Sequence, residues 1–284
     1  MDQPPPSSPG RRAARAALAG QLAADQHGVV HRAQLRAEGI TRDDVRAEVR
    51  AGRWRLAGRH TVVVDGSVPR GRGRWWWAVW ESGSGACLDG VTALQAAGLT
   101  GFESPTIHVT VPRQSAPHRL IGVRLHRRRD LGRLAGAGMP RTPPEWATIH
   151  AAQWAATDRQ AALVVCLAVQ QRLVAPARLL DAWATVRRSP RRALLASVIV
   201  DVCAGAHSLG ELDFAFWCRR YGLPEPTRQS VRTGPSGRVY LDVWWEAHRL
   251  VVEIDGERNL APSCTRQVGA GMRVRSDTSE RALN

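Results

Sequence analysis

Apolar positions in the first quarter of the chain recur at helical spacing and then change to the alternation of strands. Residues 11–26 and 32–38 predict two helices. Residues 53–64 predict two short strands around a turn at Gly58. Residues 1–10, rich in proline and serine, are expected to form a disordered tail.

A third helix is marked at both of its ends. Thr41 followed three residues later by Asp44 predicts a capping box, in which each side chain bonds the other residue's backbone N–H. Ile40 is placed to pack against Val45, and Gly52 provides the stop. The helix is therefore expected to begin after Thr41 and to end before Gly52.

Arginines recur on every fourth residue of this helix, at Arg42, Arg46 and Arg50. Val45 and Val49 are expected to form the apolar stripe that faces the core. The arginines are then expected on a separate face of the helix, where their like charges repel one another. A solvated face is one explanation and DNA binding is the favoured one. Three short helices followed by a basic hairpin predict a winged helix-turn-helix, whose third helix enters the major groove. The candidate DNA-binding residues are Arg42, Arg46, Arg50, Arg53, Arg55 and Arg59.

The middle of the chain predicts further helices. Residues 74–98 are expected to form one helix with Trp76 and Trp80 on one face. A base-stacking platform is possible there, but an apolar stripe at this spacing favours core packing. Thr142 begins a second capping signal, and helices are expected from there to about residue 204.

Residues 106–111 and 121–126 alternate with period two and predict half-buried strands. His108 and His126 are interpreted as ordinary polar positions on them. The arginine run 127–129 is either a phosphate contact or a solvated rim.

The C-terminal part predicts a helix bearing Glu211, followed by three strands at residues 228–233, 238–245 and 249–255. Asp242 lies in the middle strand. Glu253 and Asp255 are two positions apart on the third strand and therefore share a face.

Composition favours a polyanionic partner. The chain has 284 residues with Lys+Arg 40 against Asp+Glu 25, a net charge of +15, and every basic residue is arginine. Part of this bias is typical of a GC-rich genome, but arginine also binds phosphate and guanine bidentately. The five cysteines form no C-x-x-C pair and no apolar run is long enough to span a membrane, so a cytoplasmic protein without membrane association is expected.

The N-terminal segment resembles the N-terminal domain of the AbiEi-type antitoxins of type IV toxin–antitoxin systems and of related actinobacterial regulators. The resemblance runs through LAADQHGVVHRAQLRAEGITRDDVRAEVRAGRWRLAGRHTVVV. It implies a promoter-binding module that is often autoregulatory. Double-stranded DNA is then the partner, with a homodimer and a cognate toxin system as further expectations.

The C-terminal arrangement of one helix, three strands and the four carboxylates resembles the PD-(D/E)XK core of very-short-patch-repair endonucleases. The resemblance implies a catalytic set of Glu211, Asp242, Glu253 and Asp255. Asp242, with Glu253 or Asp255, would hold Mg²⁺, because this hard cation is bound by one or two carboxylates and substrate oxygens. The alternative is that these are exposed charges at strand edges.

The chain departs from that family where catalysis takes place. The lysine of the nuclease motif is replaced by Asp255, and no histidine follows the Asp-Gly pair. Residues 257–284 have few apolar positions and are expected to form an irregular tail. We therefore expect a truncated core that is impaired as a nuclease.

Together these patterns predict an α+β multi-domain protein. The winged helix-turn-helix occupies residues 11–66, an α+β linking segment 67–135, a helical segment 136–206, and an incomplete restriction-endonuclease-like core 207–256. The expected function is DNA binding as a regulator. A Mg²⁺-dependent DNA endonuclease and a degraded gene product without activity are the alternatives.

Overall fold

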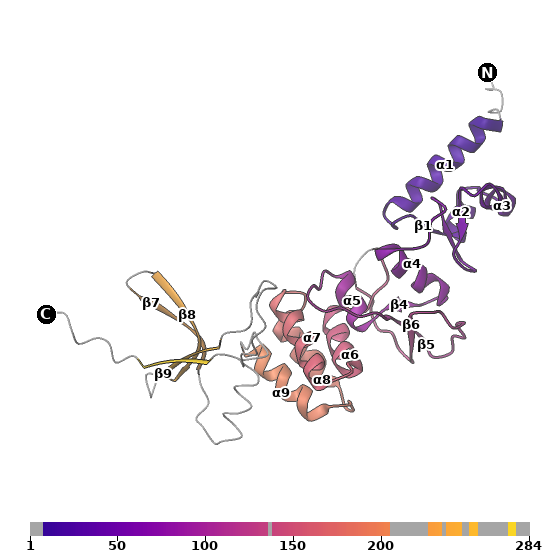
Figure 1. Ribbon diagram of the computed structural model, residues 1–284. Coiled ribbons are helices and arrows are strands. Elements are labelled where there is room, and N and C mark those ends of the chain that lie inside the picture. Colours follow the sequence, from indigo (N-terminus) through magenta and orange to yellow (C-terminus); the bar gives the residue numbers. More distant parts are fainter. Residues whose placement is uncertain are drawn as a thin grey trace, which may run out of the picture. The chain divides into compact units, whose positions relative to one another are not determined.

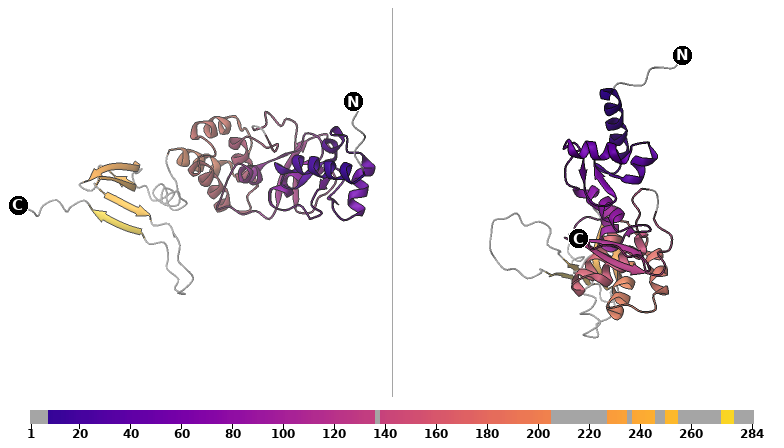
Figure 2. Two further views of the ribbon diagram at one scale, coloured as in Figure 1. Left: turned by 90° about the horizontal axis from the view of Figure 1, so that it is seen from above. Right: turned by 90° about the vertical axis from the view of Figure 1, so that its right-hand side faces the viewer.

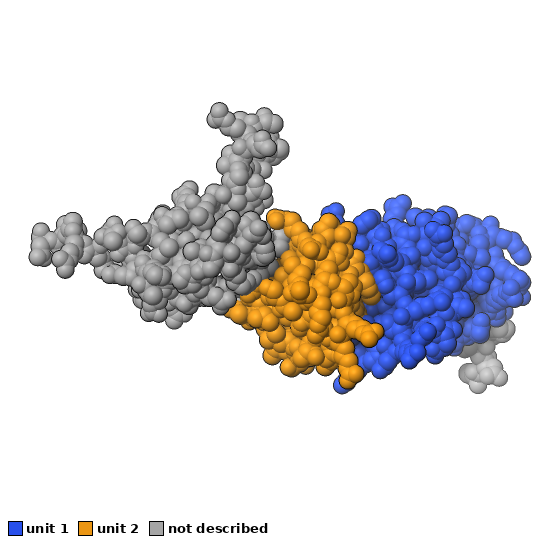
Figure 3. Space-filling view, turned by 90° about the horizontal axis from the view of Figure 1, so that it is seen from below, with its two compact units in different colours: residues 1–96, 103–143 blue, residues 97–102, 144–284 orange. Residues whose placement is uncertain are grey.

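The computed structural model describes residues 8–135, 138–204, 227–234, 237–245, 250–254 and 272–276. The chain is a mixed α/β protein that divides into two compact units. One contains residues 1–96 and 103–143, and the other contains residues 97–102 and 144–284 (Figure 3).

The first unit begins with three helices and a small sheet (Figure 1). The elements are α1 (Ser8–Ala24), β1 (Val29–His31), α2 (Arg32–Ala37), α3 (Arg42–Arg50), β2 (Arg55–Leu56) and β3 (Thr61–Val63). Strand β3 lies between β1 and β2 and is antiparallel to both. The three helices and the hairpin were predicted, but β1 was not, and α1 begins at Ser8, inside the tail expected to be disordered.

The capping box of α3 is confirmed. The hydroxyl of Thr41 accepts from Asp44 N at 3.1 Å, and Thr41 N donates to the Asp44 carboxylate at 3.0 Å. Gly52 follows with a φ of 70°, as the stop signal requires. The same arrangement begins α2, where the His31 ring accepts from Ala33 N at 3.0 Å. The N-termini of α2 and α3 are therefore both capped by side chains of residues at the start of the helix.

A hydrophobic core joins the three helices to the sheet. Trp54 is 4% exposed and packs among small and branched residues from the three helices and from strands β1 and β3. The buried members of this core are Ala19, Ala23, Val30, Leu35, Ile40, Val45, Trp54 and Val62. Ile40 and Val45 share this core, as their placement around the cap predicted.

The rest of the first unit is a second α/β layer. Its elements are α4 (Gly71–Glu81), β4 (Cys87–Leu88), α5 (Gly90–Ala96), β5 (Ile107–Pro112) and β6 (Val123–Arg128). Strand β5 is central, antiparallel to β4 and parallel to β6. Residues 107–111 are all buried, so the half-buried prediction was wrong for β5.

The prediction of one helix over residues 74–98 was wrong. Helix α4 ends at Glu81, and Gly83 and Gly85 then adopt φ values of 97° and 75° that turn the chain into β4. The tryptophans of α4 are half-buried instead of fully buried, with the rings of Trp76 and Trp80 5.0 Å apart.

The predicted boundary between residues 66 and 67 does not separate two units. Helix α4 is bonded to the β2–β3 hairpin, since Trp77 Nε1 donates to Ala57 O at 2.8 Å. The later boundary follows Pro143 instead of residue 135. Residues 97–102 belong to the second unit because the side chain of Gln171 bonds both N and O of Thr100 at 2.9 Å.

The second unit contains the predicted helical region, which forms four helices. They are α6 (Pro144–Trp154), α7 (Asp158–Gln170), α8 (Pro176–Thr185) and α9 (Arg192–Cys203). Leu179, Leu195 and Ile199 are fully buried where these helices pack together.

Four strands follow in the order β10-β9-β8-β7, and all neighbours are antiparallel (Figure 2). Strands β7 (Thr227–Gly234), β8 (Gly237–Trp245) and β9 (Leu250–Ile254) correspond to the three predicted ones. Strand β10 (Met272–Ser276) corrects the expectation of a wholly irregular tail. Its five residues pair with β9 and so extend the sheet beyond that strand.

Candidate nucleic-acid interface

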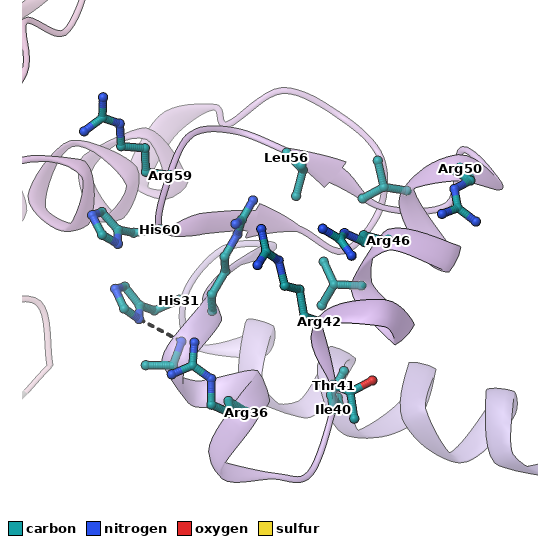
Figure 4. Close-up of a pocket in the computed structure, with 14 residues that line it drawn as sticks. His31, Arg36, Ile40, Thr41, Arg42, Arg46, Arg50, Leu56, Arg59 and His60 are labelled. Atoms are coloured by element: carbon teal, nitrogen blue, oxygen red, sulfur yellow. Dashed lines mark hydrogen bonds between the residues drawn. The ribbon is translucent and has the colours of Figure 1, made fainter.

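A hollow of about 840 Å³ lies between α2, α3 and the β2–β3 hairpin (Figure 4). Six arginines and two histidines line it, and none of its fourteen described lining residues is Asp or Glu. The arginines are Arg32, Arg36, Arg42, Arg46, Arg50 and Arg59. A concave surface with this composition attracts anions, because the cationic field is concentrated where water is partly excluded.

Four of the six predicted DNA-binding arginines line this hollow. Arg42, Arg46 and Arg50 lie along α3, and Arg59 comes from the hairpin. In Figure 4, Arg50 and Arg59 lie at opposite ends of the hollow. Arg46 also bonds Asp43 at 3.0 Å, but both side chains are more than half exposed.

Two lining arginines were missed by sequence reasoning, Arg32 and Arg36 of α2. Their spacing of four residues on a predicted helix is the same signal that identified the arginines of α3. The signal was overlooked because the predicted helix, residues 32–38, is short and the arginine spacing occurs in it only once. Arg32 N also donates to His60 O at 2.8 Å, which ties α2 to the hairpin.

The prediction that Val45 and Val49 form the inward stripe of α3 is confirmed, since both pack in the core while Arg42, Arg46 and Arg50 are exposed. Val45 and Val49 line the hollow together with the arginines, while Val45 is also a buried member of the core. The inward face of α3 is completed by Glu48, which is 1% exposed. The hollow therefore has an apolar floor and a cationic rim.

Glu48 holds Arg53, which sequence reasoning assigned to DNA. One carboxylate oxygen accepts from Arg15 Nη2 at 2.6 Å, and the other accepts from Arg53 Nε at 2.5 Å. The hydrogen bond from Arg53 is the largest cause that lowers the pKa of Glu48, and the bond from Arg15 acts in the same direction. Arg53 is thus engaged in an ion pair, and neither it nor the exposed Arg55 lines the hollow.

The turn of the hairpin is bonded to a buried carboxylate of α4. Glu81 accepts from Arg59 N, from His60 N and from the hydroxyl of Thr61, each at 2.8 Å. Glu81 is 2% exposed, and His118 Nε2 lies 3.9 Å from one of its oxygens.

His31 and His60 stack at the same end of the hollow as Arg59, with ring centroids 5.6 Å apart and an interplanar angle of 3°. Burial is the main cause that lowers the pKa of His31, followed by the charge of His60. Since His31 Nδ1 accepts from Ala33 N, the neutral ring is the form that caps α2.

The histidines of β5 and β6, which were interpreted as ordinary polar positions, contact each other. His108 Nδ1 and His126 Nε2 are 3.1 Å apart. Asp89, at the end of the neighbouring strand β4, is fully buried and accepts from the Thr110 hydroxyl at 2.6 Å. These buried polar contacts stabilise the sheet.

The C-terminal candidates are only partly within the described residues. Asp242 lies on β8 and Glu253 on β9, next to the paired positions Val243 and Val252. Glu211 and Asp255 lie outside the described residues. Within the described part of the chain, no group of three or more His, Cys, Asp or Glu is placed to hold a metal ion. Two of the four candidate carboxylates therefore lie on neighbouring strands, each one position beyond the pair Val243–Val252, and the predicted Mg²⁺ site as a whole stays a prediction.

Comparison with known proteins leaves the family open. No family model matches the chain, and no curated protein matches it. Among solved structures, a crystal structure of the RV2827C protein from Mycobacterium tuberculosis aligns with a TM-score of 0.40 and 20% identity, over 71% of this chain and 79% of that one. A similarity of this size assigns neither fold nor function. No helix among the described residues is long and apolar enough to cross a membrane.

Proposed function

We propose that the chain binds double-stranded DNA through the arginine-lined hollow. The observation that carries the proposal is the convergence of six arginines from two helices and a hairpin on one concave surface. The order α1-β1-α2-α3-β2-β3, with β3 between β1 and β2, supports a winged helix in which α3 is the recognition helix.

The dimensions of α3 suit the major groove. Arg42 and Arg50 are eight residues apart, which is about 12 Å along the helix axis, and the major groove is about 12 Å wide, enough to admit the roughly 10–12 Å diameter of a helix. The guanidinium groups bind phosphate oxygens or guanine edges in pairs of hydrogen bonds. Displacement of counterions from the DNA then contributes to affinity and makes it depend on salt.

The regulatory role comes from the sequence resemblance to AbiEi-type antitoxins. We therefore extend the proposal to binding of the promoter of the chain's own gene. A homodimer would match a palindromic site, since half-sites on DNA follow the two-fold axis of the protein. A cognate toxin system belongs to the same proposal.

The test replaces Arg42, Arg46 and Arg50 together by alanine. Affinity for the DNA upstream of the gene, and for a mixed-sequence duplex, is measured by fluorescence anisotropy between about 50 and 200 mM salt. For every arginine–phosphate interaction that the substitutions remove, the slope of log affinity against log salt is expected to flatten by about one unit.

The matched control replaces Arg178, Arg187 and Arg188, which are exposed in the second unit, and removes the same net charge. We expect the control to bind DNA with the slope of the unaltered chain. Equal loss of binding in both triple variants would mean that net charge, and not the hollow, accounts for affinity.

A second candidate function is Mg²⁺-dependent DNA cleavage by the C-terminal part. The observation that favours it is the antiparallel run β7-β8-β9, in which Asp242 and Glu253 lie on neighbouring strands, each one position beyond the pair Val243–Val252 and on the same side of it. Supercoiled plasmid incubated with Mg²⁺ or with EDTA distinguishes the two functions. Nicking that requires the metal and disappears in Asp242→Asn would establish a nuclease. An impaired core leaves the plasmid intact.

A further inference from the structure

Helix α4 holds the turn between β2 and β3 from outside the three-helix core. Glu81 accepts from three consecutive residues at the end of the turn and the start of β3, through the backbone N–H groups of Arg59 and His60 and through the Thr61 hydroxyl. Trp77 Nε1, also on α4, donates to the carbonyl of Ala57 on the other side of the turn. The turn is thus bonded at both of its ends to one helix.

Glu81 is a carboxylate at a fully buried position of α4. Its side chain is 0% exposed, and burial of an ionised group is costly unless hydrogen bonds compensate it. An apolar side chain would avoid that cost but would leave three donors without this acceptor. What the carboxylate adds is an acceptor for two successive N–H groups, which fixes the direction of the backbone at Arg59 and His60.

The turn is shaped to receive this carboxylate. A Cβ placed on Gly58 would lie 2.3 Å from Glu81 Cδ, so any larger residue would displace the carboxylate. Gly58 does not have a positive φ, so glycine is required there for the close approach of Glu81 and not for an unusual backbone conformation.

We propose that Glu81 is a positioning residue for DNA binding, which holds the β2–β3 turn so that Arg59 contacts a phosphate at one end of the hollow. The inference rests on the proposed function of the hollow. It assigns to α4, which lies outside the DNA-binding surface, a direct part in shaping that surface.

For Glu81→Gln, a positioning role and simple electrostatics predict opposite changes in the affinity for DNA. Removal of a negative charge close to a DNA-binding surface is expected to strengthen binding, because DNA is a polyanion. Glu81→Gln removes that charge and keeps the size of the side chain, but its NH₂ group faces a backbone N–H and cannot accept from it. Positioning therefore predicts weaker binding and a salt slope lower by about one unit.

The experiment measures the affinity of the full chain for a mixed-sequence DNA duplex, as a function of salt, for Glu81→Gln, Arg59→Ala and the double variant. If Glu81 acts through Arg59, each single variant removes the same interaction with DNA. The double variant is then expected to bind no more weakly than Arg59→Ala alone.

A second variant perturbs the same part of the turn without removing the charge. Gly58→Ala is expected to expel the carboxylate and to reproduce the effect of Glu81→Gln. Gly20→Ala is its control, because a Cβ there meets nothing within 4 Å. Hydrogen exchange of the Arg59 and His60 amides reports the anchoring directly, and both amides are expected to lose protection in Glu81→Gln.

The outcomes separate the two proposals. Absence of DNA binding by the unaltered chain overturns the function of the hollow. If the unaltered chain binds, then equal or tighter binding by folded Glu81→Gln and Gly58→Ala overturns the positioning role alone. Additive losses in the double variant overturn it as well.

Discussion

At the scale of single residues, two of the buried carboxylates of the first unit, Glu48 and Glu81, are compensated in different ways. Glu48 is held by two guanidinium groups, from Arg15 and Arg53, and its charge is neutralised locally. Glu81 is held by backbone N–H groups and a hydroxyl. Arginine therefore has two roles here, since Arg15 and Arg53 stabilise the fold while others line the hollow.

Acid is expected to destabilise the chain through Glu48, Asp44 and His31. The folded state lowers the pKa of the two carboxyls below their ordinary values of 4.5 and 3.8, so folded protein binds fewer protons there than unfolded protein does. Their contribution to the free energy of unfolding is complete above those values and is lost as pH falls through the lowered ones. His31, whose pKa is lowered from 6.5, adds a loss that begins at higher pH.

Urea unfolding at a series of pH values measures this dependence. Glu48→Gln should reduce the part of the loss that appears below about pH 4.5, and His31→Asn the part that begins near pH 6.5. An unchanged pH profile in both variants would contradict the assignment of these groups.

At the scale of elements, helix α1 is joined to α3 by a side chain as well as by the core. Arg15 bonds both Asp44 and Glu48, one helical turn apart on α3. Its side chain is 19% exposed, so water screens these pairs only in part. This link sets how α1 lies against the proposed recognition helix.

Arg15→Ala is expected to destabilise the chain by about 3 kcal/mol, because it leaves the buried Glu48 with only one cationic partner. The measurement is the free energy of unfolding in urea. Arg12→Ala, an exposed position on the same helix, is the control and should change stability by less than about 0.5 kcal/mol. Similar values for the two variants would show that the pair contributes nothing.

At the scale of the whole molecule, the net charge of +15 does not show which part of the chain would bind DNA. The positions of the arginines in the two units do. All six arginines of the hollow belong to the first unit, and so does Glu81. The second unit contains the helices α6–α9 and the sheet of β7–β10. The proposed DNA binding and any chemistry of the C-terminal sheet therefore belong to separate units.

A fragment of residues 1–143 is expected to keep the salt slope of the full chain. It retains every arginine of the hollow, although Thr100 is then without its hydrogen bonds to Gln171, which lowers stability. Anisotropy with the same DNA duplex, beside circular dichroism to establish folding, provides the comparison. A lower slope in a folded fragment would assign phosphate binding to the second unit.

Local sequence signals predicted the elements that form locally. The Thr41 cap, the stripe of arginines on α3, the hairpin around Gly58, the start of α6 after Thr142 and the strands β7, β8 and β9 can be read from within a few residues. The same signals missed β1, because no turn joins this short strand directly to its partner β3, which lies about 30 residues further along the chain, and they missed the break after Glu81. Strand β10 was missed because it forms by pairing with β9, residues 250–254, and no turn signal joins the two strands directly.

The sequence by itself determined where α3 begins and ends and which arginines repeat along it, because caps and helical periodicity act between neighbours. Only the tertiary structure decided how those arginines are used. The partner of Arg53 is Glu48, which must be buried by distant helices, and Arg15 reaches the same carboxylate across 33 residues. The Glu81 carboxylate meets the hairpin turn 20 to 22 residues away. Contacts over such separations depend on how elements pack, and packing follows from the burial of the whole core instead of from any local pattern.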